Sequence, residues 1–329
     1  MIDTQLAEVS NLLIVVAIVV YVLAMIGFTA DLARASQVRS DAKLAARSRS
    51  ELVGAGGPAV DLPDDPTVDE ERSDAPTALG FGFVMATVGV LLHGTGVVLR
   101  GVATSRVPWG NMYEFAMTGS AAVMVMFLLI SMRRADLRHL GAFVLGPMMV
   151  LMLLAQTLWI VPAAHLTPSL QNSHWLIIHV SVAILSTSVF TLGAVVAMLQ
   201  LLSTKRASLG EHAWGRVGAV LDRLPGPRSL EQLAFRLHAI AFVGWTFTLI
   251  AGAIWANYAW GKPWGWDPKE VWTFVIWVVY AAYLHARATQ GFRGNRAAWF
   301  ALVGFACLII NFTVVNTVIN GMHSYSGLT

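Results

Sequence analysis

Eight apolar stretches, each long enough to cross a lipid bilayer, constrain this chain of 329 residues more than any other feature. A transmembrane helix needs about 20 mainly apolar residues, and it satisfies its backbone hydrogen bonds internally. Charged residues make up only 12% of the chain, about half the share that is typical of soluble domains. We therefore predict an all-α, polytopic transmembrane helix bundle with spans at residues 11–29, 78–100, 114–132, 140–161, 175–201, 235–256, 271–288 and 297–318.

The region before the second span divides into two predicted units. Residues 1–30 begin with an acidic leader that lacks lysine and arginine, which favours a retained N-terminal transmembrane helix over a cleaved signal peptide. Residues 31–77 are predicted to be a polar cytoplasmic loop, and its part 50–77 is rich in Gly, Pro and Asp, which is typical of disorder. Residues 78–329 form the predicted membrane domain, with a tryptophan-rich outer loop at 255–272.

Lysine and arginine are divided unevenly between the two sides of the predicted bundle. Eighteen of the 22 fall in or beside segments 30–77, 133–139, 202–234 and 289–296, which all lie on one side. Because basic residues accumulate in cytoplasmic loops, that side is predicted to be the inside. Eight crossings then place both termini on the outer, extracytoplasmic side.

The charge balance and the cysteine content exclude several classes of protein. A formal net charge of +3 does not indicate a basic surface for nucleic acid. The single cysteine, Cys307, lies in an apolar stretch, so the chain has no internal disulfide, no CxxC redox pair and no CxxCH haem-attachment motif. The chain is therefore neither a thiol oxidoreductase nor itself a c-type cytochrome.

Five of the chain's 12 tryptophans lie in or beside the outer loop between the sixth and seventh spans. Trp255 and Trp272 stand at helix ends, which is typical of the aromatic belt at a membrane interface. Trp260, Trp264 and Trp266 stand among glycine and proline, and such a loop can lay indole faces against a flat apolar ligand. The belt is the alternative for these three residues, and we favour the ligand platform.

The same loop ends in a strong helix-start signal. Asp267 is predicted to be the N-cap, Pro268 the first helical residue and Glu270 the N3 partner of a capping box. This pattern favours a structural role for Asp267 over that of a catalytic acid. The cap would still serve a site, because it fixes where the loop tryptophans point.

Two histidines on the outer side are a second signal. His179 lies about 6 Å inside the outer end of the fifth span, given the helical rise per residue. His323 follows the eighth span on the same side. Two histidines from different helices at a similar depth can be the axial ligands of one haem iron, and neither has the spacing of a zinc site. For each, the alternative is an ordinary hydrogen-bonded side chain.

Other polar residues in the spans allow two interpretations each. His285 lies about 21 Å down the seventh span, where an ionisable residue is a functional candidate, or where it snorkels to the inner interface. Glu114, at the start of the third span, either stabilises that helix end by its charge or lines a site beside the tryptophan loop. His93 and His238 are predicted to form hydrogen bonds between packed helices.

Four stretches of the sequence resemble the CcsA/ResC family of cytochrome c biogenesis proteins, the haem-handling membrane proteins of system II. Residues 260–267, WGKPWGWD, match the WGxxWxWD signature (the WWD domain) that this family shares with CcmC and CcmF. Residues 170–180, 283–287 and 321–325 match further family motifs in the same order. The resemblance covers about residues 80–329.

The resemblance implies a haem lyase component, a holocytochrome c synthase. Such a protein binds haem b at the outer face and attaches it by thioether bonds to the CxxCH cysteines of exported apocytochrome c. The implied location is the cell membrane rather than an organellar, thylakoid-type membrane. The alternatives are a transmembrane haem exporter whose attachment step happens elsewhere, and a haem-binding electron carrier.

The resemblance also implies roles for individual residues. The implied haem-binding set is His179, His323, Trp260, Trp264, Trp266 and Asp267, with the two histidines as ligands of the iron. His285 matches the membrane histidine that holds haem in transit. The second transit ligand comes from a CcsB/ResB partner, so this chain is expected to need a separate partner subunit.

Overall fold

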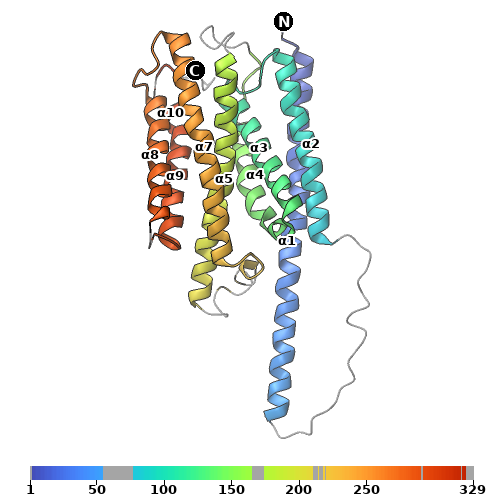
Figure 1. Cartoon of the computed structure of the whole chain (residues 1–329). Coiled ribbons are helices and arrows are strands. Elements are labelled where there is room, and N and C mark those ends of the chain that lie inside the picture. Colours follow the sequence, from blue (N-terminus) through green and yellow to red (C-terminus); the bar gives the residue numbers. More distant parts are fainter. Residues whose placement is uncertain are drawn as a thin grey trace.

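The computed structural model of the chain is an all-helical bundle, which confirms the predicted fold class (Figure 1). It describes residues 2–54, 77–164, 174–209, 214, 218, 220–289, 292–319 and 321–323, and only the backbone of residues 35–54. The helices are α1 (Thr4–Gly54), α2 (Ala78–Thr104), α3 (Met112–Arg133), the 3-10 helix η2 (Ala135–Leu140), α4 (Gly141–Leu158), α5 (His174–Leu209), α7 (Pro227–Trp260), α8 (Pro268–Ala288), α9 (Asn295–Phe312) and α10 (Val314–Thr317).

Within the described residues, eight helices are long and apolar enough to cross a membrane. Each of the eight predicted spans lies within one of these helices or overlaps it by most of its length. The fifth and sixth spans extend further than predicted, because α5 and α7 have 36 and 34 residues. The apolar pattern therefore predicted the number and order of the spans correctly.

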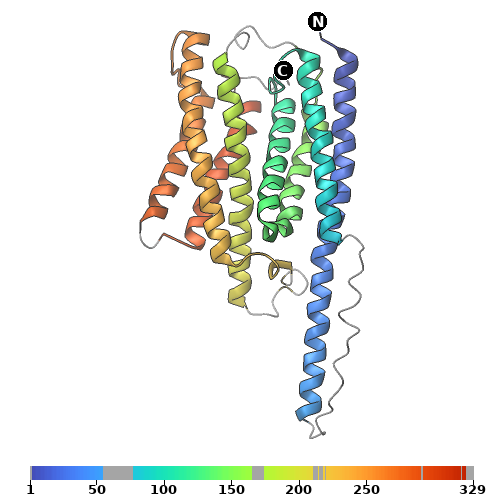
Figure 2. The ribbon, with the colours of Figure 1, turned by 45° about the vertical axis from the view of Figure 1, so that its right-hand side comes forward.

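The first helix is longer than the sequence pattern predicted. We expected a transmembrane helix to residue 30 and a polar loop from residue 31, but α1 continues to Gly54. The added segment is rich in Ala, Arg and Leu and has no proline or glycine before Gly54, so its residues favour helix. Figure 2 shows this part of α1 extending beyond the other helices. Residues 55–76, which include most of the predicted disordered stretch, lie outside the described residues.

The helices pack in antiparallel neighbours, α1 with α2, α5 with α7 and α8 with α9 (Figures 1 and 2). The α1–α2 pair approaches so closely that a Cβ atom on Gly27 would lie 2.6 Å from the Cα atom of Gly82. Small residues at such crossings let helix backbones meet inside a membrane, where packing rather than water exclusion holds helices together.

The bundle has two ends, which differ in charge. The end at which α1, α3, α5 and α8 begin is called the site end, and the opposite end is called the basic end. The N-terminal end of α1 lies at the site end, where the Asp3 N–H donates to the Ala103 carbonyl at 3.0 Å. At the basic end, Asp31 accepts from Arg223 at 2.8 Å, and Arg287 pairs with Glu231 at 2.9 Å.

Candidate functional site

A cavity of about 810 Å³ lies at the site end. Its wall comes from α3, α5, α7, α8, α9 and the loop between α2 and α3, so it is built by segments far apart in the sequence. Pockets of about 300–1,000 Å³ are typical for small-molecule ligands. The aromatic residues of the wall are Trp109, Phe115, Trp245, Trp255, Trp264 and Phe312.

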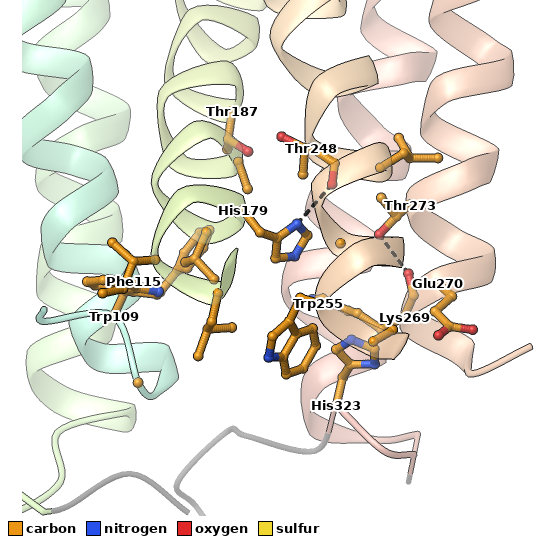
Figure 3. A pocket seen from close by; sticks show the side chains of 18 of the residues that line it. Trp109, Phe115, His179, Thr187, Thr248, Trp255, Lys269, Glu270, Thr273 and His323 are labelled. Atoms are coloured by element: carbon orange, nitrogen blue, oxygen red, sulfur yellow. Dashed lines mark hydrogen bonds between the residues drawn. The ribbon is translucent and has the colours of Figure 1, made fainter. Parts of the chain in front are cut away.

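His179 enters this cavity from α5 (Figure 3). Its Nδ1 lies 2.9 Å from the carbonyl oxygen of Thr248 on α7. A carbonyl only accepts hydrogen bonds, so Nδ1 carries the proton and the lone pair of the neutral ring is on Nε2. Gly252 makes room for this ring, because a Cβ atom there would lie 2.7 Å from the His179 Cε1. The two helices therefore fix both the position and the tautomer of His179.

His323 lines the same cavity and comes from the segment after α10 (Figure 3). Its Nδ1 lies 2.8 Å from the Asp267 carboxylate, whose side chain is 3% exposed. Its ring lies edge-on to Trp255 and Trp260, with centroids 5.7 and 4.8 Å apart. Trp255 also stacks on His179, with ring centroids 6.2 Å apart, so this one indole contacts both histidines.

Asp267 joins the start of α8 to the tail that carries His323. The predicted capping box is confirmed: Asp267 caps the helix, Pro268 opens it, and Glu270 accepts from the Asp267 N–H at 3.1 Å. Asp267 Oδ2 accepts from the Lys269 N–H and contacts the His323 ring, and Oδ1 accepts from the N–H of Met322. Burial would raise the pKa of Asp267, but the hydrogen bonds from His323 and Met322 outweigh it and lower the pKa below its ordinary value. Asp267 is therefore an anion that holds His323.

The tryptophans of the signature do not share one environment. Trp260 is the last residue of α7 rather than a loop residue, and Trp264 lines the cavity. Trp266 is 76% exposed, with φ +57°, and does not line the cavity. The prediction that Trp255 belongs to the membrane belt is wrong, because it is 1% exposed and packs against Leu176 beside both histidines.

Glu114 supports the opposite wall. Its carboxylate is fully buried and pairs with Arg100 at 3.1 Å and with Arg106 at 2.7 Å. It also accepts from the Gly110 N–H at 2.9 Å, which fixes the loop that carries Trp109. Glu114 therefore lies in the first turn of α3, where its charge was predicted to stabilise the helix end. In the structure its carboxylate forms salt bridges with two arginines.

Three further histidines of the spans, His285, His93 and His238, do not line the cavity, whereas His174, the first residue of α5, does. His285 is exposed, near the basic end of α8, and the structure does not bring it together with His179 and His323. His93 and His238 are fully buried; each places Nδ1 near a protein oxygen, Tyr21 Oη at 3.4 Å and the Ala234 carbonyl at 2.6 Å. Only the His93 contact joins two helices, as predicted, since Ala234 is on the same helix as His238.

Lys269 is a cavity residue that the sequence pattern did not reveal. Its Nζ donates to the Asn311 carbonyl at 2.8 Å and to Asn316 Oδ1 at 2.7 Å, so the side chain reaches α9 and α10. One signal could have marked it: a lysine in the first turn of a helix opposes the positive end of the helix dipole. Such a position suggests a purpose other than helix stability.

The comparison with protein families bears directly on these residues. The family model for cytochrome c assembly protein matches residues 109–323, more than half of the chain. The chain belongs to this family. The matched region begins at Trp109 and ends at His323, and both of these residues line the cavity.

Individual family members support the assignment. The cytochrome c biogenesis protein CcsA of Guillardia theta is 39% identical over 176 residues, which is 50% of this chain and 58% of that protein. CcsA of Gloeobacter violaceus is 32% identical over 293 residues, covering 74% and 86%. CcsA of Thermosynechococcus vestitus is 37% identical over 193 residues, covering 50% and 60%. The chain thus spans less than two thirds of the length of several relatives that it matches.

Proposed function

We propose that this chain is the haem-binding component of a cytochrome c biogenesis system. In this proposal it binds haem b, its substrate, in the cavity at the site end. Together with a CcsB/ResB-type partner it attaches this haem to the CxxCH cysteines of exported apocytochrome c, as a haem lyase. Membership of the cytochrome c assembly family supports the process, and the cavity supports the haem step.

The observation that carries the proposal is the pair of histidines in one aromatic cavity. His179 and His323 come from segments far apart in the chain and both line the cavity. Each has its Nδ1 beside a protein oxygen, a carbonyl for His179 and a carboxylate for His323. This is the usual second contact of a histidine that binds a metal through its Nε2 atom.

The residues of the cavity also fit the rest of the haem molecule. Among the described residues no group of three or more His, Cys, Asp or Glu is placed to hold a metal ion. Two imidazoles are one set of donors that haem iron takes in addition to its porphyrin nitrogens. The indoles of Trp255 and Trp264 and the ring of Phe115 offer the apolar faces that a porphyrin ring requires.

The chemistry of attachment makes modest demands on this chain. A cysteine thiol adds across a haem vinyl group: an S–C bond forms, the C=C bond becomes single, and the thiol hydrogen goes to the other vinyl carbon. No net oxidation or reduction occurs. The cavity must hold the vinyl groups against the thiols, and such positioning can supply much of the rate. The histidine of the CxxCH motif then replaces one protein ligand and releases the product.

The distribution of charge supports one orientation in the membrane. In our proposal the basic end is cytoplasmic and the site end faces outward, because lysine and arginine accumulate on the cytoplasmic side. The membrane is the cell membrane, and a thylakoid-type membrane is the alternative. Exposed His285, near the basic end, is then available to hold haem in transit together with a ligand from the partner subunit.

The test is a haem analysis of the full-length chain, co-expressed with its partner and a CxxCH reporter. We expect a haem absorption spectrum in the purified wild type, which shifts in His179→Ala and in His323→Ala and is lost in the double variant. Covalent haem on the denatured reporter should fall in parallel. His139→Ala, a histidine at the basic end that pairs with Asp31, is the matched control.

The outcomes separate the candidate functions. Haem binding without covalent haem on the reporter would favour a haem exporter over a lyase. Full reporter maturation in the double variant would contradict the proposed haem ligands. An unchanged spectrum in the double variant would place the haem at another position in the protein.

A further inference from the structure

Lys269 brings a cation into a cavity whose wall is otherwise mostly apolar and aromatic. It lies two residues after Asp267 in the first turn of α8, and it is partly buried. Of its three ammonium N–H groups, two donate to neutral oxygens, the carbonyl of Asn311 and the amide oxygen of Asn316. The third has no acceptor among the residues that the structure describes.

The carboxylates near Lys269 are engaged by other groups. Asp267 accepts from His323 and from two backbone N–H groups, those of Met322 and Lys269 itself. Glu270 accepts from the N–H groups of Gly265 and Asp267. In the described part of the chain, no carboxylate oxygen lies within 4.0 Å of the Lys269 ammonium. A charge in such a place costs free energy unless a partner of opposite sign arrives.

Arg106, the arginine of the cavity wall, differs from Lys269 in this respect. Its guanidinium makes two hydrogen bonds to the Glu114 carboxylate, at 2.7 and 3.0 Å. Its remaining N–H groups donate to the carbonyls of Ala164 and Val107. Arg106 is therefore saturated by the protein, whereas Lys269 has a donor left for a ligand.

We propose that Lys269 is the counter-ion for a carboxylate of the ligand in this cavity, namely a propionate of the porphyrin. This inference rests on the proposed function and deepens it. In the proposed complex the histidines bind the iron and the indoles that line the cavity contact the ring, but neither distinguishes one edge of the porphyrin from another. A salt bridge from Lys269 to the propionate edge sets the in-plane orientation of the ring, and so decides where the vinyl groups face.

The experiment uses metal-free porphyrins, because they separate this contact from ligation of iron. The full-length chain, purified in detergent, is titrated with protoporphyrin IX and with its dimethyl ester, and binding is followed by quenching of tryptophan fluorescence. We expect wild type to bind the free acid about tenfold or more tightly than the ester, since hydrogen bonds between charged groups contribute that much.

Three variants test whether Lys269 causes this preference. Lys269→Gln keeps a donor for the Asn311 carbonyl and for Asn316 but removes the charge, and we expect it to lose most of the preference. Lys269→Arg should retain it. Lys262→Gln is the matched control, because Lys262 is an exposed lysine of the adjacent loop that does not line the cavity. The acid-to-ester ratio of each variant, divided by that of wild type, cancels differences in porphyrin partition into detergent.

The failure of this inference differs from the failure of the proposed function. Equal affinities of wild type for acid and ester, or an unchanged ratio in Lys269→Gln, would overturn the role of Lys269 and leave the histidine ligands in place. A full loss of preference in Lys262→Gln would also overturn it. If neither porphyrin nor haem binds to wild type, both proposals fall.

Discussion

The two ends of the bundle differ in how their salt bridges are exposed. At the basic end, Arg134 pairs with Asp136, and both side chains are 48% exposed. At the site end, Glu114 pairs with Arg100, and the Glu114 carboxylate is fully buried. Asp267, also at the site end, is only 3% exposed. The basic end holds many charges at helix ends and in connecting segments; the site end holds few, and several of them are enclosed. The difference separates two uses of charge. In our proposal, numerous charges at one end orient the chain in a membrane, while buried charges at the other fix the geometry of a site.

The largest expected effect comes from the buried pair. Glu114→Gln leaves the charges of Arg100 and Arg106 without their carboxylate, which should lower the free energy of unfolding by about 3–5 kcal/mol. Asp136→Asn at the basic end should have no measurable effect, because exposed pairs contribute little. Unfolding curves in detergent measure both. Similar losses in the two variants would show that burial does not distinguish the two ends.

The next effect concerns aromatic residues. Trp255→Ala removes an indole that is 1% exposed and contacts both site histidines. It should lower the free energy of unfolding by about 3 kcal/mol. This value is in the lower part of the usual range, because a cavity already borders the ring. Trp299→Ala at the basic end removes a ring that is 62% exposed and should change stability by less than about 0.5 kcal/mol. The same unfolding measurement decides. A tolerant Trp255→Ala variant would return this residue to the membrane belt.

A smaller effect depends on pH. The pKa of Asp267 is lower in the folded protein than its ordinary value, so its contribution to stability is present above about pH 4 and is lost as the pH falls through the folded pKa. Asp267→Asn should cost about 1.5 kcal/mol at pH 7, as expected for a hydrogen bond to a charged group. The difference between wild type and variant should shrink below pH 4. Unfolding curves between pH 7 and pH 3 measure it, and a constant difference would contradict the assignment.

The smallest effect sharpens the comparison within the site end itself. Trp266 has φ +57° and is 76% exposed, so Trp266→Gly relieves a left-handed backbone and removes few contacts. Stability should rise by no more than about 1 kcal/mol, and porphyrin affinity should not change. Trp264→Gly, in the same loop, should weaken porphyrin binding because Trp264 lines the cavity. Equal losses of affinity would show that both indoles contact the ligand.

The parts of this molecule that the sequence predicted well depend on local patterns. A run of apolar residues is enough to predict a span, and Asp267-Pro268-Lys269-Glu270 is enough to predict a capping box, since both are decided by neighbours in the chain. The longer α1 was missed because its polar extension has no apolar pattern, although its residues favour helix.

The site required information that local patterns do not hold. The positions of His179 and His323 relative to the ends of their spans predicted a similar depth for the two residues. They did not predict that Trp255 contacts both of them. A tryptophan at a helix end has the same sequence signal whether it faces lipid or a neighbouring helix. Lys269 was missed because its partners, Asn311 and Asn316, are more than 40 positions away in the chain.

The link between Asp267 and the tail has a consequence for biosynthesis. The Asp267 carboxylate, at the start of α8, accepts hydrogen bonds from the Met322 N–H and the His323 ring. Both of these residues follow every span in the sequence. A ribosome produces the chain from its N-terminus, so the first seven spans can fold before these groups exist. The cavity is thus completed last, and we expect a chain that stops before residue 322 to build the bundle but to lack His323 in the cavity wall.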